Sequence, residues 1–250
     1  TGSGRARRLT RTPGDDGSAE WAPDGSRLVF QTGSLHPMLR ADVALLDTAT
    51  GRITPLTRGD DAESGPRWSP DGTRIAFSRQ HWDGRPNTVC AVTVDGADTW
   101  CYRPGGVVLD EVVGWADDRH LLARTRAPVA SRLVRLEVGS GRYQLVDTLP
   151  GVWDASPDGQ WLLCRCTRPG YPEGTWFVRP AGDARQLRPI HLTGAPASAE
   201  LFWAGAPTPP RHLAHLSIEL GEGGPVPAVP YQLRAVGTDP AGAPVRLNAL

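Results

Sequence analysis

The chain has 250 residues and a formal net charge of zero, because 27 basic residues, all of them arginine, balance 27 acidic ones. This balance argues against a nucleic-acid-binding surface, and the absence of lysine excludes a P-loop phosphate cradle or a lysine Schiff base within these residues. No run approaches the roughly 18–20 apolar residues that a membrane span needs, so we expect no membrane-spanning segment.

A ten-residue pattern recurs along the chain. Its copies are WAPDGSRLVF at 21–30, WSPDGTRIAF at 68–77, WADDRHLLA at 115–123 and ASPDGQWLLC at 155–164. The period is therefore 47 residues twice and then 40. Proline, aspartate and glycine favour a tight turn, and the apolar run that follows predicts a buried strand. We expect Trp21, Trp68 and Trp115, which open the first three copies, to pack between neighbouring repeats.

Two further strands are predicted after each copy, over 41–57, 87–103, 131–149 and 175–189. Four strands per repeat and a period in the forties are typical of propeller blades, and no helix is expected anywhere. A weaker echo, LFWAGAP at 201–207, has lost the Asp-Gly turn. The fold class is therefore all-β, a β-propeller of four-stranded blades.

The cysteines leave two interpretations open. The Asp-Gly pair at 95–96 favours a two-residue hairpin loop, which would place Cys90 opposite Cys101 on the paired strand. A cross-strand disulfide is then possible, whereas a register slip of one residue would leave two free thiols. Cys164 and Cys166 share one face of a strand, and we interpret them as small apolar residues between blades rather than as a redox pair.

The pattern changes near the C-terminus. We expect propeller blades over 1–206 and a proline-containing linker over 207–211. Residues 212–250 resemble the first strands of a bacterial Ig-like domain, because LSIEL is followed by YQLRAVGTDPAGAPV, a strand that ends in a D-x-x-G-x-P-V hairpin turn. This resemblance implies a partial Ig-like β-sandwich at the C-terminal end.

The W-[SA]-P-D-G-x-R-[IL]-x-F pattern, preceded by RRLT at 7–10 or PLTRGDD at 55–61, closely resembles the repeat of TolB-like propellers over roughly 7–190. The resemblance implies a propeller, usually six-bladed, in a periplasmic or secreted bacterial protein that often serves as a protein-binding platform. The third copy departs from the family, since residues 117–119 are Asp-Asp-Arg where Pro-Asp-Gly stands elsewhere. Four good blades are visible, so we expect an incomplete ring with blades missing at its N-terminal side.

In a propeller, the loops between second and third strands lie on the same face as the connections between blades. We predict a ligand-binding surface on this loop face, for a protein segment or a glycan. Its residues are His81, Trp82, Asp83, Arg85, Asp61, Glu63, Arg126, Arg168 and Tyr171, with His36, Asp60, Asp110 and Glu111 on the same loops. Trp82 is singled out, because a tryptophan at a loop tip has few core partners and suits a binding hot spot. Ordinary solvated loops are the competing interpretation.

Catalytic motifs are absent from the sequence. There is no G-x-S-x-G elbow, H-E-x-x-H helix or D-x-[DN]-x-[DN]-G calcium loop, so we predict no catalytic residue, no cofactor and no metal ligand. A metal site that joins His36, His81 and loop acids is a less favoured alternative. The favoured function is a non-catalytic binding or scaffold module of a periplasmic, secreted or surface protein. The alternatives are the accessory propeller of a prolyl-oligopeptidase-like hydrolase, a metal-dependent propeller lyase, and a structural spacer.

Overall fold

The structure is a computed structural model, and its described residues form β-strands joined by turns and loops. It describes residues 8–12, 14–33, 41–103, 105, 107–126, 132–147, 151–156, 159–181, 183 and 186–193, and the backbone of 215–220, 233–238 and 244–246. No α-helix occurs within these residues, as expected. In particular, this part of the chain contains no helix with the length and hydropathy of a membrane-spanning segment.

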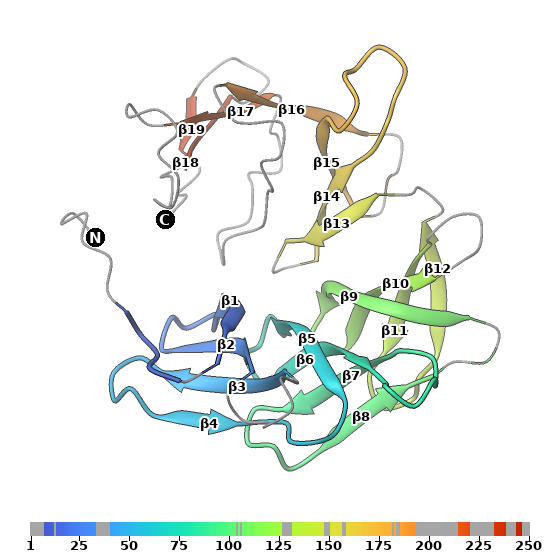
Figure 1. Ribbon diagram of the computed structural model, residues 1–250. Coiled ribbons are helices and arrows are strands. Elements are labelled where there is room, and N and C mark those ends of the chain that lie inside the picture. Colours follow the sequence, from blue (N-terminus) through green and yellow to red (C-terminus); the bar gives the residue numbers. More distant parts are fainter. Residues whose placement is uncertain are drawn as a thin grey trace.

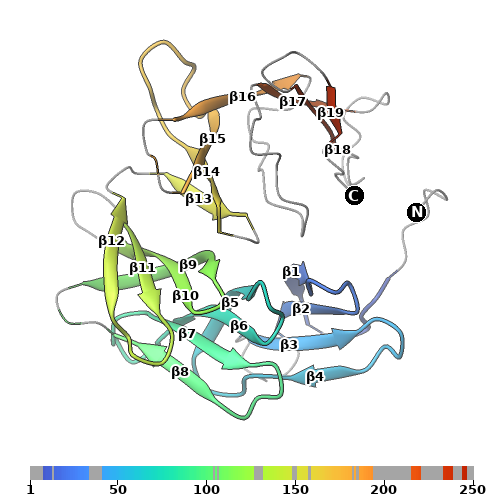
Figure 2. The same ribbon diagram turned by 180° about the vertical axis from the view of Figure 1, so that it is seen from behind.

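Sixteen strands form four consecutive four-stranded antiparallel units, which we call blades 1 to 4. Blade 1 contains β1 (Asp16–Trp21), β2 (Arg27–Thr32), β3 (Asp42–Asp47) and β4 (Ile53–Pro55), and blade 2 contains β5 (Ala62–Trp68), β6 (Arg74–Gln80), β7 (Thr88–Thr93) and β8 (Thr99–Tyr102). Blade 3 contains β9 (Val108–Asp117), β10 (His120–Arg126), β11 (Leu133–Glu137) and β12 (Tyr143–Asp147), and blade 4 contains β13 (Val152–Ala155), β14 (Trp161–Arg165), β15 (Trp176–Pro180) and β16 (Arg188–Thr193). The blades follow one another in an arc, with the first strand of each turned toward its centre (Figure 1, Figure 2).

The repeated turn forms as its residues predict. In blade 2 the backbone N–H of Gly72 donates to the carbonyl of Ser69 (2.9 Å), and Gly72 has a φ of 69° that a side chain would resist. The Asp71 carboxylate accepts a hydrogen bond from the backbone N–H of Thr73 (3.0 Å). The turn closes locally, so its sequence alone specifies the β5–β6 hairpin.

Blade 3 makes the corresponding turn with different chemistry. The Asp117 carboxylate accepts hydrogen bonds from the backbone N–H groups of Arg119 (2.8 Å) and His120 (2.9 Å), and it contacts the Arg135 guanidinium. These hydrogen bonds lower the pKa of Asp117, although burial acts in the opposite direction and is the largest single influence. One aspartate side chain therefore replaces the Pro-Gly geometry of the other copies.

The repeat tryptophans join successive blades. The indole Nε1 of Trp68 donates to the carbonyl of Glu20 (3.2 Å), and that of Trp115 donates to the carbonyl of Arg67 (3.1 Å), 48 residues earlier in both cases. Trp68 and Trp115 are 4% and 2% exposed. Trp21 is 46% exposed, so the expectation that it packs between blades is wrong for the described structure. The physical reason is that no described blade precedes blade 1.

Blade 4 packs on blade 3 with small residues in place of a tryptophan. Ala155 stands where the other copies have tryptophan, and a Cβ added to Gly114 would lie 3.0 Å from the Ala155 Cβ. A larger side chain at either position would push the blades apart. The apolar core accordingly lies between blades, and the cluster between blades 1 and 2 consists of Ala22, Val29, Val43, Leu45, Trp68, Ile75, Phe77, Cys90 and Val92.

Blade 2 carries a disulfide between its outer two strands. Cys90 on β7 pairs with Cys101 on β8 in the predicted register, and their sulfur atoms are bonded. The loop between the strands is longer than the predicted two residues, because the backbone N–H of Gly96 donates to the carbonyl of Thr93 (2.8 Å) and that of Thr93 donates to the carbonyl of Asp98 (2.9 Å). Cys164 and Cys166 are free thiols, and burial raises the pKa of Cys164 to about 12. A thiol with such a pKa is inert at neutral pH, in agreement with a packing role.

Three strands follow blade 4, where the Ig-like segment is expected. These are β17 (His215–Leu220), β18 (Leu233–Thr238) and β19 (Pro244–Arg246). They extend the sheet of blade 4, since β17 pairs in parallel with β16 and antiparallel with β18. The second sheet of a sandwich is not seen within the described residues, and the 207–211 linker lies outside them, so the Ig-like domain stays a prediction.

Candidate functional site

His81 begins the β6–β7 loop, and the structure gives it a structural role. Its Nδ1 lies 2.9 Å from the Asp61 carboxylate, and its Nε2 lies 3.2 Å from the hydroxyl of Thr88. An acid, an imidazole and a hydroxyl are thus aligned as in a nucleophilic relay. However, the His81 side chain is 6% exposed and Thr88 is 4% exposed, so no substrate reaches the hydroxyl. The cluster instead ties the β6–β7 loop to the connection that enters blade 2.

Trp82 projects from this anchored loop and is 58% exposed. The Asp83 carboxylate accepts hydrogen bonds from the backbone N–H (3.1 Å) and the Nε (2.5 Å) of Arg85, and these bonds lower the pKa of Asp83. At the end of the loop, the Asn87 amide donates to the Asp110 carboxylate of blade 3 (3.4 Å). The loop is therefore held at both ends and at its tip, with the indole in solvent.

Glu63 is not on the accessible surface, contrary to the prediction. It is 1% exposed, accepts a hydrogen bond from Arg79 Nε (2.8 Å), and accepts another from the hydroxyl of Thr57 (3.2 Å). Burial raises its pKa, and Arg79 partly offsets this effect. The same Thr57 hydroxyl accepts from the backbone N–H of Val43 in blade 1 (2.8 Å), so this network joins blades 1 and 2.

The remaining predicted residues lie on blades 3 and 4. Arg126 is exposed and pairs with Asp110 (2.8 Å). Tyr171 is 42% exposed and packs its ring edge-on against Phe177 at 5.2 Å, while its backbone N–H donates to the carbonyl of Arg168 (3.2 Å). Among the described residues, no hydrogen bond, ion pair or ring contact joins Arg168 or Tyr171 to the Trp82 loop. His36 lies outside the described residues.

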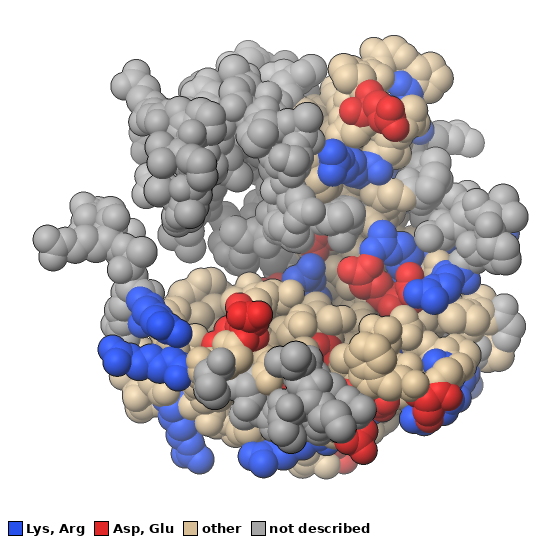
Figure 3. Space-filling view, viewed as in Figure 1, with Lys and Arg blue, Asp and Glu red and all other residues tan. Residues whose placement is uncertain are grey.

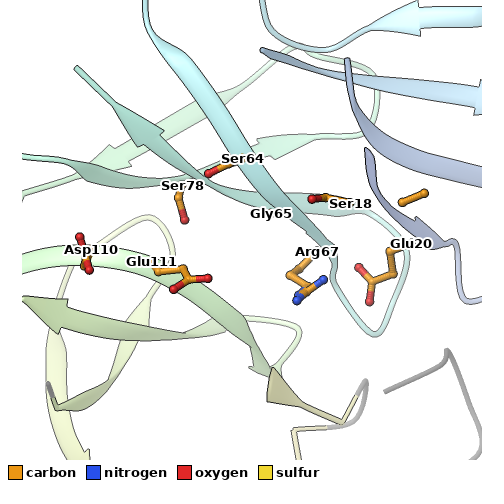
Figure 4. A pocket seen from close by; sticks show the side chains of 9 residues that line it. Ser18, Glu20, Ser64, Gly65, Arg67, Ser78, Asp110 and Glu111 are labelled. Atoms are coloured by element: carbon orange, nitrogen blue, oxygen red, sulfur yellow. The ribbon is translucent and has the colours of Figure 1, made fainter. Parts of the chain in front are cut away.

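A pocket of about 660 Å³ opens along the inner strands of blades 1 to 3, and sequence reasoning missed most of it. It is lined by Ser18, Ala19, Glu20, Ser64, Gly65, Arg67, Ser78, Asp110 and Glu111. Figure 4 shows the Arg67 side chain between those of Glu20 and Glu111 in this view. Asp110, at the rim, is the residue that accepts the hydrogen bond from Asn87, so the Trp82 loop and the pocket are neighbours.

The deep charges of the pocket occupy one repeating position, the residue just before each repeat anchor. This residue is Glu20, Arg67, Gly114 and Asp154 in blades 1 to 4. Arg67 Nη2 lies 3.4 Å from the Asp154 carboxylate, so blades 2 and 4 interact directly where blade 3 has only glycine. An alignment of the four copies contains this signal, because the anchors agree while the preceding residue changes charge.

Glu20 is the most perturbed acid of the pocket. One of its oxygens accepts a hydrogen bond from the backbone N–H of Trp68 (2.7 Å). Burial in the pocket raises the pKa of Glu20 to about 7, Arg67 and the Trp68 hydrogen bond act against this rise, and the charge of Asp154 adds to it. Near neutral pH this carboxyl is therefore only partly ionised.

A bulge shapes the pocket wall in blades 1 and 2. Ser18 and Gly65, each three residues before its tryptophan, have φ values of 49° and 57°, and strand register shifts beside both. Such a bulge bends a strand and re-aims the side chains that follow it. Gly65 adopts this conformation freely, whereas Ser18 adopts it under strain. Both residues line the pocket.

Two acids of the pocket lining form ion pairs with arginines that lie outside the pocket. Arg124 contacts Glu111 and Arg126 pairs with Asp110, and Figure 3 shows side chains of both signs meeting over β9 and β10. Among the described residues, no group of three or more His, Cys, Asp or Glu side chains is placed to hold a metal ion. The pocket offers carboxylates, hydroxyls and one guanidinium, which suits recognition of a polar ligand.

Comparison with known proteins shows likeness of fold. The chain matches no family model and no curated protein sequence. TolB from Acinetobacter baumannii superposes with a TM-score of 0.57 at 14% identity, over 94% of this chain and 54% of TolB. The putative TolB from Agrobacterium tumefaciens gives 0.51 at 13% identity, over 75% and 84%. A puromycin-hydrolyzing peptidase from Mycobacterium tuberculosis gives 0.52 at 17% identity, over 94% and 37%.

These similarities support a TolB-like β-propeller fold. The chain spans about half the length of the Acinetobacter TolB, so the activity of any whole protein does not follow from them.

Proposed function

We propose that this chain is a non-catalytic binding module of a bacterial periplasmic or extracellular protein, and that its loop face binds an extended segment of a partner protein. The observation that carries the proposal is Trp82, whose side chain is 58% exposed on a loop held by hydrogen bonds. Exposed aromatic side chains of this kind are enriched among residues that dominate binding energy.

The anchoring of the loop favours binding. Ordering a loop during association opposes binding, and a loop already held in place avoids much of that cost. Here His81 is fixed by Asp61, and Asn87 contacts Asp110 at the rim of the pocket. A bound segment that covers Trp82 would therefore continue over the rim into the pocket.

The experiment is selection of random twelve-residue peptides, displayed on phage, on the full chain. Selected peptides should lose at least about 30-fold in affinity for Trp82→Ala, the loss that corresponds to a hot spot of about 2 kcal/mol. Trp21→Ala, an exposed tryptophan on the first strand of blade 1, is the matched control and should bind normally. Selected peptides that bind Trp82→Ala as tightly as the original chain would refute the proposal. A glycan array probed with the same two variants tests the second ligand class.

The competing proposal is that the propeller is an accessory domain of a hydrolase. The fold shared with the Mycobacterium tuberculosis peptidase is compatible with it. The full reading frame distinguishes the two, because the hydrolase requires a Ser/Asp/His domain elsewhere in the protein. The lyase alternative requires a bound divalent metal, which elemental analysis of the purified chain detects.

A further inference from the structure

The lining of the pocket is rich in hydrogen-bond acceptors. Three carboxyl groups line it, from Glu20, Asp110 and Glu111, against the single guanidinium of Arg67. The hydroxyls of Ser18 and Ser64 add further groups that can accept hydrogen bonds. A ligand group with several donors therefore suits this lining.

The charges that line the pocket indicate whether a cation or an anion would bind there. Arg67 already pairs with the Asp154 carboxylate (3.4 Å). The charge of Asp154 also acts on Glu20, whose pKa it raises. An anion placed beside Arg67 would have to approach these acids and the pocket carboxyls as well. Like charges at such separations repel, and the repulsion strengthens away from bulk water.

The outer arginines reduce the negative charge only in part. Arg126, which pairs with Asp110, has a side chain that is 69% exposed, so solvent and salt screen its charge. Arg124, 22% exposed, contacts Glu111 more closely. Deeper in the pocket, Arg67 faces both Glu20 and the Asp154 carboxylate, so one guanidinium offsets two acids.

We propose that this pocket binds a protonated amine or guanidinium, in the context of the proposed function a lysine or arginine side chain of the bound partner segment. The cation would donate to the Glu20 carboxylate and to the serine hydroxyls at the level of Arg67, with Asp110 and Glu111 at the entrance. This inference rests on the proposed function for the source of the cation, but the chemistry of the pocket stands by itself.

Binding of a cation should be coupled to ionisation of Glu20. The charged groups that face Glu20 are Arg67 from β5 and Asp154 from β13, with the acids of β9 across the pocket. A pKa near 7 means that about a tenth of Glu20 is ionised at pH 6 and about nine tenths at pH 8. A lysine-like amine stays protonated over this range. If only the carboxylate binds, affinity rises about tenfold from pH 6 to pH 8.

The test uses the full chain with n-butylammonium as probe, butyrate as the anionic control and 1-butanol as the neutral one, followed by ligand-observed NMR. We expect n-butylammonium to bind, butyrate to bind at least about tenfold more weakly, and the affinity for the amine to rise about tenfold from pH 6 to pH 8. Glu20→Gln keeps an acceptor for the Trp68 N–H, so the fold should persist. This variant should bind more weakly and lose the pH dependence. Glu137→Gln, at the end of β11 and outside the pocket, should behave as the original chain.

Two results would overturn the inference. One is binding of butyrate as tight as that of the amine. The other is an unchanged pH dependence in Glu20→Gln. The outcome is separable from that of the proposed function, because Trp82→Ala should weaken binding of displayed peptides at least about 30-fold and leave n-butylammonium binding intact.

Discussion

Replacement of Glu20 by glutamine should make the protein more stable above neutral pH and leave it nearly unchanged in acid. Burial raises the pKa of Glu20 from 4.5 to about 7, so the folded state holds this proton more tightly than the unfolded chain does. The stabilisation that the proton provides is fully present below pH 4.5 and is lost as pH rises through 7. At 1.36 kcal/mol per pKa unit, the loss is about 3 kcal/mol by pH 8.5.

Denaturant unfolding of both variants from pH 4 to pH 8.5 measures this effect, because the other titrating groups are common to both and cancel in the difference. The free energy of unfolding of Glu20→Gln, minus that of the original chain, should increase by about 3 kcal/mol across the range. Most of the increase should lie between pH 5 and pH 7.5. A difference that does not change with pH, or that falls as pH rises, would refute the conclusion that burial raises the pKa of Glu20 in the folded state.

Three further predictions concern stability. Trp68→Ala should lower the free energy of unfolding by about 3–5 kcal/mol, whereas Trp21→Ala should change it by less than about 1 kcal/mol, because Trp68 is enclosed between blades and Trp21 is not. Replacement of both Cys90 and Cys101 by alanine should cost about 3 kcal/mol, since their bond closes a loop with a sequence separation of 11. Gly159→Ala should destabilise the chain by more than about 2 kcal/mol, because the added Cβ would lie 2.4 Å from backbone atoms of Ala116.

Denaturant melts of the purified variants check all three. Gly25→Ala is the control for the glycine, since Gly25 has a similar φ of 71° but no atom within 4 Å of an added Cβ. Equal losses at Gly25 and Gly159 would mean that backbone strain alone matters. Equal losses at Trp21 and Trp68 would contradict the packing of blade 2 on blade 1.

The blades were predictable because their determinants are local. A turn such as that around Gly72 closes within five residues, and the apolar run after it specifies a buried strand whatever lies elsewhere. The pairing of Cys90 with Cys101 was one of two interpretations that the sequence left open. The register is the predicted one, although the loop that connects the strands is longer than the predicted two residues, since the backbone N–H of Thr93 donates to the carbonyl of Asp98. The departure at Asp117 did not prevent the hairpin, because one carboxylate supplied the missing turn contacts.

The exposure of the predicted site residues could not be predicted from their neighbours along the chain. Several residues expected on loops lie in strands instead: Glu63 in β5, Arg126 in β10, and Asp110 and Glu111 in β9. The other described ones lie in loops or connections, but their residue types did not reveal which were accessible. Glu63 and His81 are buried because partners from other segments, Arg79 and Asp61, satisfy them. Trp82, the next residue along the same loop, is exposed because no described residue packs over it in this way.

The sequence by itself determined the repeat, the turns, the strands and the aromatic character of the loops, all of which depend on neighbours along the chain. Only the tertiary structure decided that Glu20, Arg67 and Asp154 meet at the centre of the arc. Their approach depends on how three blades pack and on the bulges that re-aim the inner strands. Charge in a pocket is a property of what packing brings together, so the same carboxyl that would be an ordinary surface acid in an isolated strand becomes an acid with a pKa near 7 here.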